Sequence, residues 1–98
     1  MDLLLDKGEK NLNCIDVSKI TDFKNIFSYK NMKDVDISLW DVSNGKIFEF
    51  MFYESVNFNS DISMWDVSNG ENFSFMFQGC GEFNQDLSKW NTKKATTM

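Results

Sequence analysis

Aspartates at a fixed spacing are the residues of this sequence with the clearest capacity for chemistry. They form two series with a step of 25 residues: Asp36, Asp61 and Asp86 in one, and Asp16, Asp41 and Asp66 in the other. Stacked at the roughly 4.8 Å spacing of neighbouring strands, the carboxylates of one series would repel one another. Calcium would offset this repulsion, because it prefers oxygen ligands. Alternatively, each carboxylate accepts backbone N–H groups of its own turn, which we favour because no glycine-rich calcium-binding motif is present.

An enzymatic role is not expected from these carboxylates. The chain has no His, so it lacks an imidazole base, and its ten basic residues are all Lys, so it lacks the forked guanidinium group of Arg. Acid–base catalysis by two carboxyl groups needs environments that push their pKa values apart. Residues repeated in equivalent environments are the opposite case. The sequence therefore predicts a protein that is not an enzyme and that has no cofactor and no metal centre.

Tryptophans repeat with the same step, at Trp40, Trp65 and Trp90. Large rings at one position of every copy are expected to form a spine of the core. Ile15, which occupies the equivalent position one step earlier, favours this interpretation. The alternative is an exposed platform of rings for a carbohydrate or a peptide.

The step of 25 residues organises the whole chain. The stretch DISLWDVSNGKIFEFMF recurs as DISMWDVSNGENFSFMF, and a diverged copy precedes both. We expect a leader or cap over residues 1–10 and a repeat region over 11–98, with copies at 11–35, 36–60 and 61–85 and a partial copy at 86–98. A fixed period of this length is typical of repeat proteins, in which each unit buries its apolar face on its neighbours.

Two local patterns predict the elements inside each copy. From Phe58 to Val67, residues that favour β-structure are spaced through polar ones, which indicates one or two short strands. Over residues 71–77 the apolar residues fall at i, i+3 and i+4, which is one face of a short helix. Ser68 stands three residues before Glu71, the spacing of a capping box. The predicted fold is an α/β repeat solenoid with about 25 residues per turn.

Phe50 and Phe75 lie off the apolar face of the predicted helices. They follow Phe48 and Phe73 by two residues, which is roughly 200° around a helix. Asn25 stands at this position in the first copy, so the position does not require an apolar side chain. Two adjacent exposed rings would form an interaction patch, whereas packing between neighbouring turns is the alternative.

The stretch FNSDISMWDVSNGENFSFMF, with the following GCGEFNQDLSKWN, resembles the repeat of the BspA-like surface proteins. That repeat is widespread in mycoplasma surface lipoproteins and is grouped with divergent leucine-rich repeats; the resemblance covers residues 11–98. It implies a right-handed, leucine-rich-repeat-like solenoid, a location on the cell surface or outside the cell, and a role in adhesion or protein binding. Gly45 and Gly70 depart from the family pattern, which has an apolar residue there, so looser packing of the helix is expected.

The expected function is that of a non-enzymatic bacterial surface module whose partner is a protein or another surface ligand. The alternative is an architectural spacer or a variable surface antigen with no dedicated ligand. A net charge of −5 argues against nucleic acid, and the abundance of Lys, Asn and Phe is typical of a low-GC bacterium. No signal peptide is recognised at the N-terminus. The ends of a solenoid need caps, so self-association through open ends is also expected.

The two cysteines, Cys14 and Cys80, fall at different positions of the repeat. In stacked copies they would lie beyond the roughly 7 Å that a disulfide can span between Cα atoms. We therefore expect two free, buried thiols.

Overall fold

Tight turns held by an Asp or Asn side chain make up much of each copy. The computed structural model describes residues 8–97. A carboxylate oxygen of Asp41 accepts the backbone N–H of Ser43 at 3.0 Å and the Ser43 hydroxyl at 2.6 Å. Such a side-chain bond to the residue two positions later reproduces the geometry of a backbone turn. The same backbone bond is made by Asn11, Asp16, Asp22, Asn31, Asp36, Asp61, Asp66, Asn72, Asp86 and Asn91.

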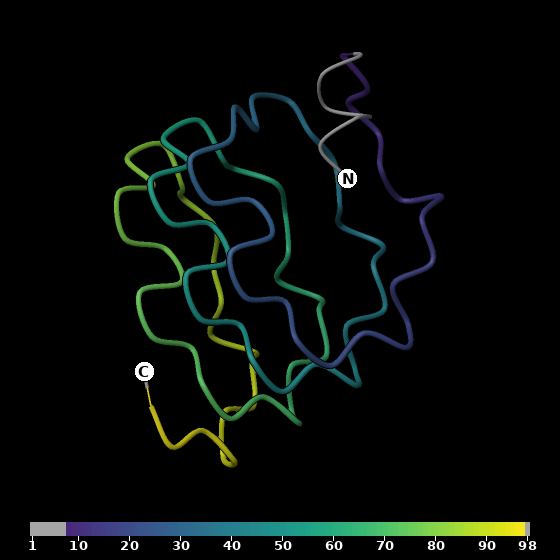
Figure 1. Cartoon of the computed structure of the whole chain (residues 1–98), viewed down its shortest axis with the longest axis vertical. Coiled ribbons are helices and arrows are strands. Elements are labelled where there is room, and N and C mark those ends of the chain that lie inside the picture. The colour runs from purple at the N-terminus through teal and green to yellow at the C-terminus, as the bar shows by residue number, and fades with distance from the viewer. Residues whose placement is uncertain (1–7, 98) are drawn as a thin grey trace.

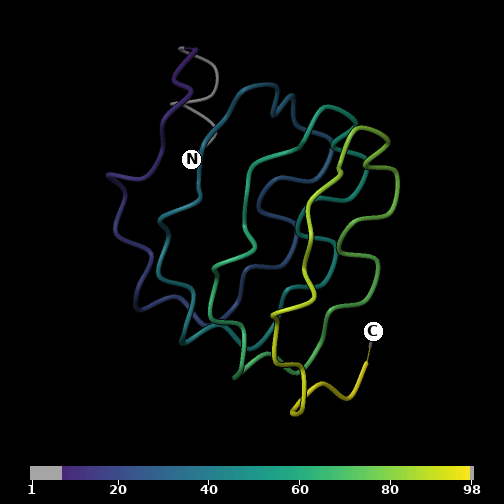
Figure 2. The same cartoon turned by 180° about the vertical axis from the view of Figure 1, so that it is seen from behind.

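Neighbouring copies lie side by side with an offset of 25 residues. Isolated parallel bridges join Asn11 to Asp36 and Asp22 to Ile47, and they continue from Ile47 to Asn72 and on to Thr97. The copies follow one another across the molecule, from the purple first copy to the yellow partial fourth copy (Figures 1 and 2). The described chain measures 37 × 27 × 20 Å along its principal axes.

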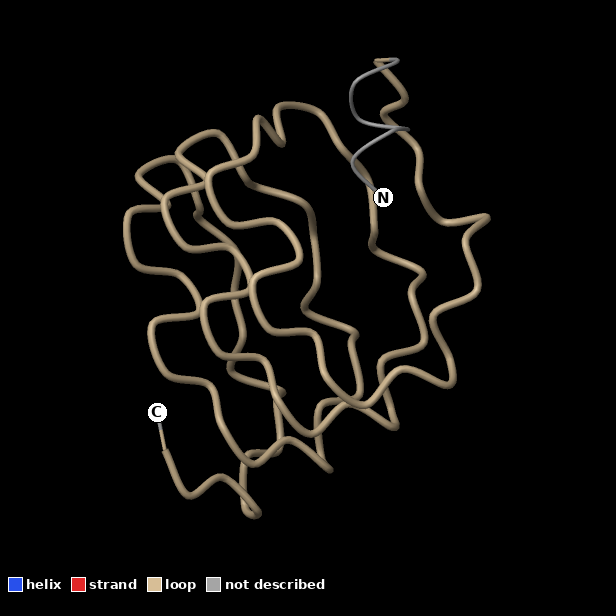
Figure 3. Ribbon diagram, viewed as in Figure 1, coloured by secondary structure: helices blue, strands red, loops and turns tan. Residues whose placement is uncertain are grey.

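Neither a helix nor a strand longer than an isolated bridge occurs between residues 8 and 97 (Figure 3). The predicted α/β solenoid, leucine-rich-repeat-like with a short helix and short strands in each turn, is therefore wrong for this chain. The capping box is wrong as well, because the Ser68 hydroxyl donates to Asp66 at 2.6 Å. The leader expected over residues 1–10 lies mostly outside the described residues.

In the second copy, the segment that corresponds to the predicted helix begins at residue 46. Its backbone N–H groups donate to two kinds of partner. The N–H groups of Phe48, Phe50 and Phe52 donate to carbonyl groups of the third copy at 2.8–3.0 Å. Those of Met51 and Tyr53 donate to the carbonyl group three residues earlier in their own copy, at 3.2 Å. In an α-helix, every internal N–H group donates to the carbonyl group four residues earlier in the same segment. A helix here would therefore remove the bonds that join the copies.

Ring stacking sets a distance between copies that helices cannot match. Phe23, Phe48 and Phe73 stack with centroids 5.4 and 5.2 Å apart, and the Phe residues four positions later stack at 5.7 Å. Packed helices need roughly 8–10 Å between their axes. We call these two stacks the Phe ladders: Phe23, Phe48 and Phe73 in one, and Phe27, Phe52 and Phe77 in the other. Their spacing is compatible with a flat path of turns and incompatible with a layer of helices.

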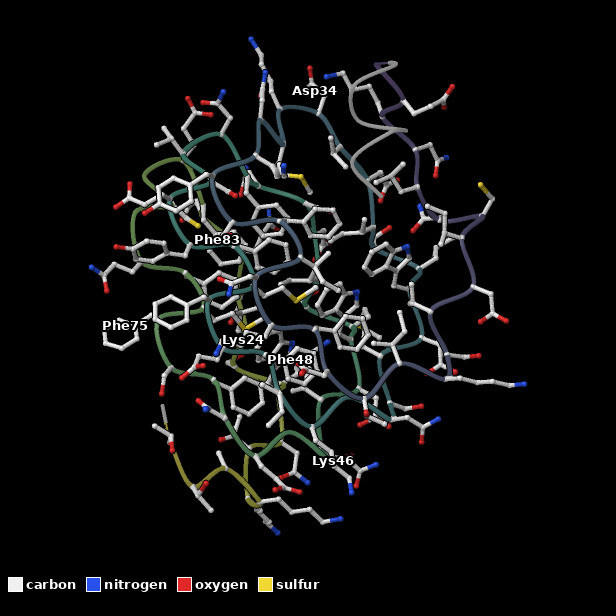
Figure 4. All side chains as sticks on the ribbon, viewed as in Figure 1. Lys24, Asp34, Lys46, Phe48, Phe75 and Phe83 are labelled. Carbon is white, nitrogen blue, oxygen red and sulfur yellow. The ribbon has the colours of Figure 1, made fainter. Side chains whose placement is uncertain are left out.

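Tryptophan side chains join the copies through the core. Trp40 and Trp65 are each 4% exposed, and their rings stack 6.4 Å apart. The Nε1–H of Trp65 donates to the carbonyl oxygen of Ile37 at 3.0 Å, so the indole reaches back into the preceding copy. Trp90 makes the same bond to Ile62, although it is only partly buried. Figure 4 shows Phe48 and Phe83 directed into the same interior.

Gly45 and Gly70 make room for the Phe ladder. A Cβ atom on Gly70 would lie 2.2 Å from Cζ of Phe73 and 3.0 Å from the carbonyl oxygen of Val67, and Gly45 has the same relation to Phe48. Both glycines are buried. The expectation that they loosen the packing of a helix is therefore wrong, because a ring occupies the space where a side chain would stand.

Replacing Trp65 by Ala should lower the free energy of unfolding by about 3–5 kcal/mol, because a buried stacked ring is removed and the Ile37 carbonyl loses its donor. Urea unfolding followed by circular dichroism measures this loss. The matched control is Met64→Ala at the neighbouring residue, which is 76% exposed and should change stability by less than about 0.5 kcal/mol. An unchanged midpoint for Trp65→Ala would contradict the described core.

Replacing Gly70 by Ala should destabilise the chain by roughly 1–3 kcal/mol, because the new methyl group overlaps the ring of Phe73. Gly81→Ala is the matched control, since no atom lies within 4 Å of its Cβ position. That variant should be neutral or slightly more stable, because Ala restricts the unfolded chain. Equal thermal midpoints for the two variants would show that the ring does not occupy the space beside Gly70.

Candidate interaction surface

The six repeated aspartates use their carboxylates within their own turns. The hydroxyl and the backbone N–H of Ser43 hold the pKa of Asp41 below its usual value, while the neighbouring Asp16 and Asp66 act in the opposite direction. The Ser two residues later is the largest cause of a lowered pKa in every other member of the two series, namely Asp16, Asp36, Asp61, Asp66 and Asp86. All six side chains are solvent-exposed and ionised at neutral pH.

Asparagine side chains hold turns in the same way as aspartate side chains in this protein. Asn11, Asn72 and Asn91 each accept the N–H two residues later through an amide oxygen, at 2.9–3.0 Å. The turn therefore requires an oxygen acceptor and does not require a charge. Within residues 8–97, no group of three or more His, Cys, Asp or Glu side chains is placed to hold a metal ion, so calcium has no ligand cluster there.

The two cysteines are free, but they differ in burial. Cys14 is exposed, which contradicts the expectation that both thiols are buried. The thiol of Cys80 donates to the carbonyl oxygen of Phe52 at 2.9 Å, as the hydroxyl of Ser55 does to Phe27 one copy earlier. Burial raises the pKa of Cys80 to about 11, so this thiol stays protonated at neutral pH and is a weak nucleophile.

A continuous row of aromatic rings crosses the surface of the three full copies. We call Tyr29, Phe50, Tyr53 and Phe75 the aromatic row. Successive centroids lie 5.4 Å apart from Tyr29 to Tyr53, 5.2 Å from Tyr53 to Phe50, and 5.2 Å from Phe50 to Phe75. Tyr29 is 72% and Phe75 54% exposed, and the other two rings are partly buried. Figure 4 shows Phe75 at the outer edge of the molecule, away from the core.

The two Phe residues of the row occupy an unusual backbone conformation. Phe50 and Phe75 have φ angles of 58° and 57°, in the left-handed region, and Asn25 at the equivalent position of the first copy has 62°. Asn adopts this region readily, whereas other residues with a Cβ lose roughly 1–2 kcal/mol there. The second and third copies therefore keep rings at a position where Asn would be more stable. Tyr29 and Glu54 adopt the same conformation, with φ angles of 60° and 58°, so left-handed residues are a regular part of each copy, and only the choice of Phe at 50 and 75 is not required by the backbone.

Polar groups flank the row. Lys24 Nζ lies 3.3 Å from a carboxylate oxygen of Glu49. Lys24 directly precedes Asn25, and Glu49 directly precedes Phe50. The side-chain amide of Asn72 donates to the same carboxylate group at 3.4 Å. Rings surrounded by polar, solvent-accessible groups are the usual composition of a protein interface.

Sequence reasoning found only half of this surface. For Phe50 and Phe75 an interaction patch and packing between neighbouring turns were both open; their rings do stack between neighbouring copies, 5.2 Å apart, and they lie within the row, whereas Tyr29 and Tyr53 were missed. These two residues occupy different positions of the repeat, and neither position is aromatic in the other copies: Glu54 and Gly79 correspond to Tyr29, and Ser28 and Gln78 correspond to Tyr53. A search for rings that break the pattern of the repeat would have found both.

The family described as Mycoplasma protein of unknown function, DUF285, matches residues 4–98. A low-GC bacterial source, predicted from composition, fits this family. No curated protein and no solved structure matches the chain significantly. None of the described residues forms a helix with the length and hydrophobicity of a membrane span.

Acidification should weaken the fold through the Asp turns. Because the folded-state pKa of these residues lies below the unfolded value, their contribution is complete above about pH 4 and is lost as the pH falls through the folded-state values. The urea midpoint should therefore decrease as the pH falls below about 4. The double variant Asp41→Asn, Asp66→Asn keeps an oxygen acceptor in both turns and should show a smaller decrease. An identical decrease in both proteins would place the pH dependence elsewhere.

Proposed function

The chain belongs to the Mycoplasma family of unknown function DUF285, and from this premise we propose that it is a non-enzymatic surface module that binds a protein through the aromatic row. The observation that carries the proposal is the pair of stacked Phe rings on left-handed backbone, of which Phe75 is exposed and Phe50 partly buried, next to one Tyr ring of the first copy and one of the second. Tyr and Phe are enriched at protein interfaces, because a rigid ring buries a large area at a small cost in conformational entropy.

A location on the cell surface or outside the cell is part of the proposal. It is supported by the resemblance of the FN-x-DIS-x-WDVSN pattern to the repeat of BspA-like surface proteins. Controlled proteolysis of intact cells tests the location: a surface protein is cleaved while a cytoplasmic marker remains intact, and cleavage only after lysis would contradict it.

The non-enzymatic part rests on how the reactive groups are used. The aspartates accept hydrogen bonds within turns that Asn also forms, and the thiol of Cys80 is protonated and bonded to a backbone carbonyl. The aspartates repeat with the architecture, whereas the aromatic row includes Tyr29 and Tyr53, whose positions are not aromatic in the other copies. Function is therefore assigned to the row.

Replacing both Phe50 and Phe75 by Asn should weaken binding and leave the fold intact or more stable, because Asn25 already occupies the same left-handed position. Fluorescent beads coated with the chain are incubated with cultured animal cells, and retained beads are counted after washing. We expect about tenfold fewer retained beads for the double variant, together with an unchanged or higher thermal midpoint.

Leu39→Asn is the matched control, since it removes an exposed apolar side chain that is not part of the row. It should retain full adhesion, and treatment of the cells with trypsin should abolish adhesion if the ligand is a protein. Equal adhesion of the wild-type chain and the double variant would contradict the proposal and favour a spacer or a variable antigen without a dedicated ligand.

A further inference from the structure

A polar hollow with a volume of about 480 Å³ lies beside the Ser-Asn-Gly turns of the repeat. We call it the lysine hollow. Its lining comes from all four copies but from only two positions of the repeat: Lys19, Asn44, Asn69 and Lys94 share one, and Thr21, Lys46 and Glu71 share the other. A hollow of this size is within the range of ligand sites, and its polar lining selects a polar ligand.

The lysine hollow runs across the copies along one edge of the stack. The backbone N–H of Lys46 donates to the carbonyl oxygen of Thr21 at 2.8 Å, and that of Glu71 donates to the carbonyl oxygen of Lys46 at 2.7 Å. These bonds place equivalent residues of successive copies side by side, so the hollow is a lateral groove and not an end face. Figure 4 shows Lys46 near the lower edge of the molecule, apart from Phe75 of the aromatic row.

The charge of the lysine hollow is opposite to that of the whole chain. Among the described residues that line it, three are Lys and one, Glu71, is acidic, whereas the chain has 15 acidic and ten basic residues and a net charge of −5. Within residues 8–97, no carboxylate forms an ion pair with any of the three ammonium groups. The lysines therefore concentrate unpaired positive charge at one place on an acidic molecule, which attracts an anionic ligand.

The repeat architecture does not require these lysines. The side-chain amide of Asn69 donates to the carbonyl oxygen of Ser43 at 2.7 Å, and Asn44 makes the same bond one copy earlier, so Asn joins the copies at this position. Lys94 occupies the same position, but its Nζ donates to the amide oxygen of Asn69 at 2.8 Å, which fixes its ammonium group beside the hollow. The positive charge is thus a departure from the repeat, as the Tyr rings are in the aromatic row.

We propose that the lysine hollow binds an anionic polysaccharide, whose sulfate or carboxylate groups pair with the ammonium groups of Lys19, Lys46 and Lys94. These lysines belong to the first, second and fourth copies, which span roughly 15 Å at the spacing of paired strands. A linear chain of sugars carries charges over such a length, whereas a single small anion reaches only part of it. The side-chain amides of Asn44 and Asn69 are held in place and offer hydrogen bonds to sugar hydroxyl groups.

A polysaccharide fits this hollow better than a nucleic acid does. Among the described residues that line the hollow, none is aromatic, so bases have no ring on which to stack. The net charge of −5 also opposes the approach of a long phosphate backbone. The lysine hollow shares no residue with the aromatic row, so this inference goes beyond the binding of a protein and does not rest on it.

Three labelled hexasaccharides test the proposal with the full chain, and their binding is followed by fluorescence anisotropy. A heparin hexasaccharide carries sulfate and carboxylate groups, a hyaluronan hexasaccharide carries carboxylate groups only, and maltohexaose is neutral. The heparin hexasaccharide should bind saturably and more weakly as the salt concentration rises, and maltohexaose should not bind. Binding of the hyaluronan hexasaccharide with similar affinity would assign recognition to carboxylate groups, and its absence would assign it to sulfate groups.

Residues that other copies already carry provide the test variant. The triple variant Lys19→Asn, Lys46→Thr, Lys94→Asn should keep the fold and weaken binding of the heparin hexasaccharide by about tenfold or more. The triple variant Lys10→Gln, Lys33→Gln, Lys89→Gln is the matched control, because it removes the same charge from exposed positions outside the hollow. It should weaken binding by less than about threefold.

Two further variants separate this site from its surroundings. Glu71→Thr removes the acidic side chain from the hollow and should strengthen binding by up to about fivefold, the range of one exposed charge interaction. The double variant Phe50→Asn, Phe75→Asn should bind the heparin hexasaccharide with unchanged affinity while its adhesion decreases. The failure of this inference is therefore distinguishable from the failure of the proposed function.

Any of three results would overturn the proposal. The first is the absence of saturable binding of both anionic hexasaccharides by a chain whose thermal midpoint is normal. The second is equal weakening by the two triple variants, which would mean that overall charge and not the hollow attracts the ligand. The third is tighter binding of a single-stranded oligonucleotide with the same number of charges, which would make a nucleic acid the preferred ligand.

Discussion

The close stacking of Phe rings between successive copies is the constraint on which the rest of the structure depends. Centroids 5.2–5.7 Å apart require the backbones of neighbouring copies to lie at about the distance of paired strands. At that distance every second N–H group of a segment meets a carbonyl group of the next copy. Three other features follow from this one spacing: the alternation of hydrogen bonds within and between copies, the bond from each Trp indole to the preceding copy, and the glycines beside the rings.

The constraint also explains why repetition is a poor guide to function in this chain. A turn that must be flat and must recur every 25 residues needs an oxygen acceptor two residues before a backbone donor. Asp and Asn both supply it, so Asp41 and Asn91 are equivalent in the turn although only one of them carries a charge. The regularity of the carboxylates thus reflects the geometry of the turns. It carries no information about a metal ion or a reaction.

The sequence predicted the offset between copies but not the conformation inside them. Many identities share one register, and the same step of 25 residues separates the partners of every bridge. The helix was wrong for a local reason: Phe48, Met51 and Phe52 fall at a helical spacing, but a path of alternating turns buries the same three side chains. Periodicity within one segment cannot separate these two solutions. The deciding bonds run to residues 24 positions away, and the left-handed φ of Phe50 has no signature in residue type, because Phe rarely adopts it.

The aromatic row shows how a site can arise on such a scaffold. No position of the repeat holds an aromatic residue in all three full copies along the row, since Phe50 and Phe75 share one position while Tyr29 and Tyr53 occupy two others. The row nevertheless runs unbroken across the copies, because the 5 Å layers bring side chains from different positions into contact. Buried ladders and Asx turns hold each copy in place, so exposed positions are free to differ. A specific surface can therefore be composed from the differences between copies without disturbing the bonds that join them.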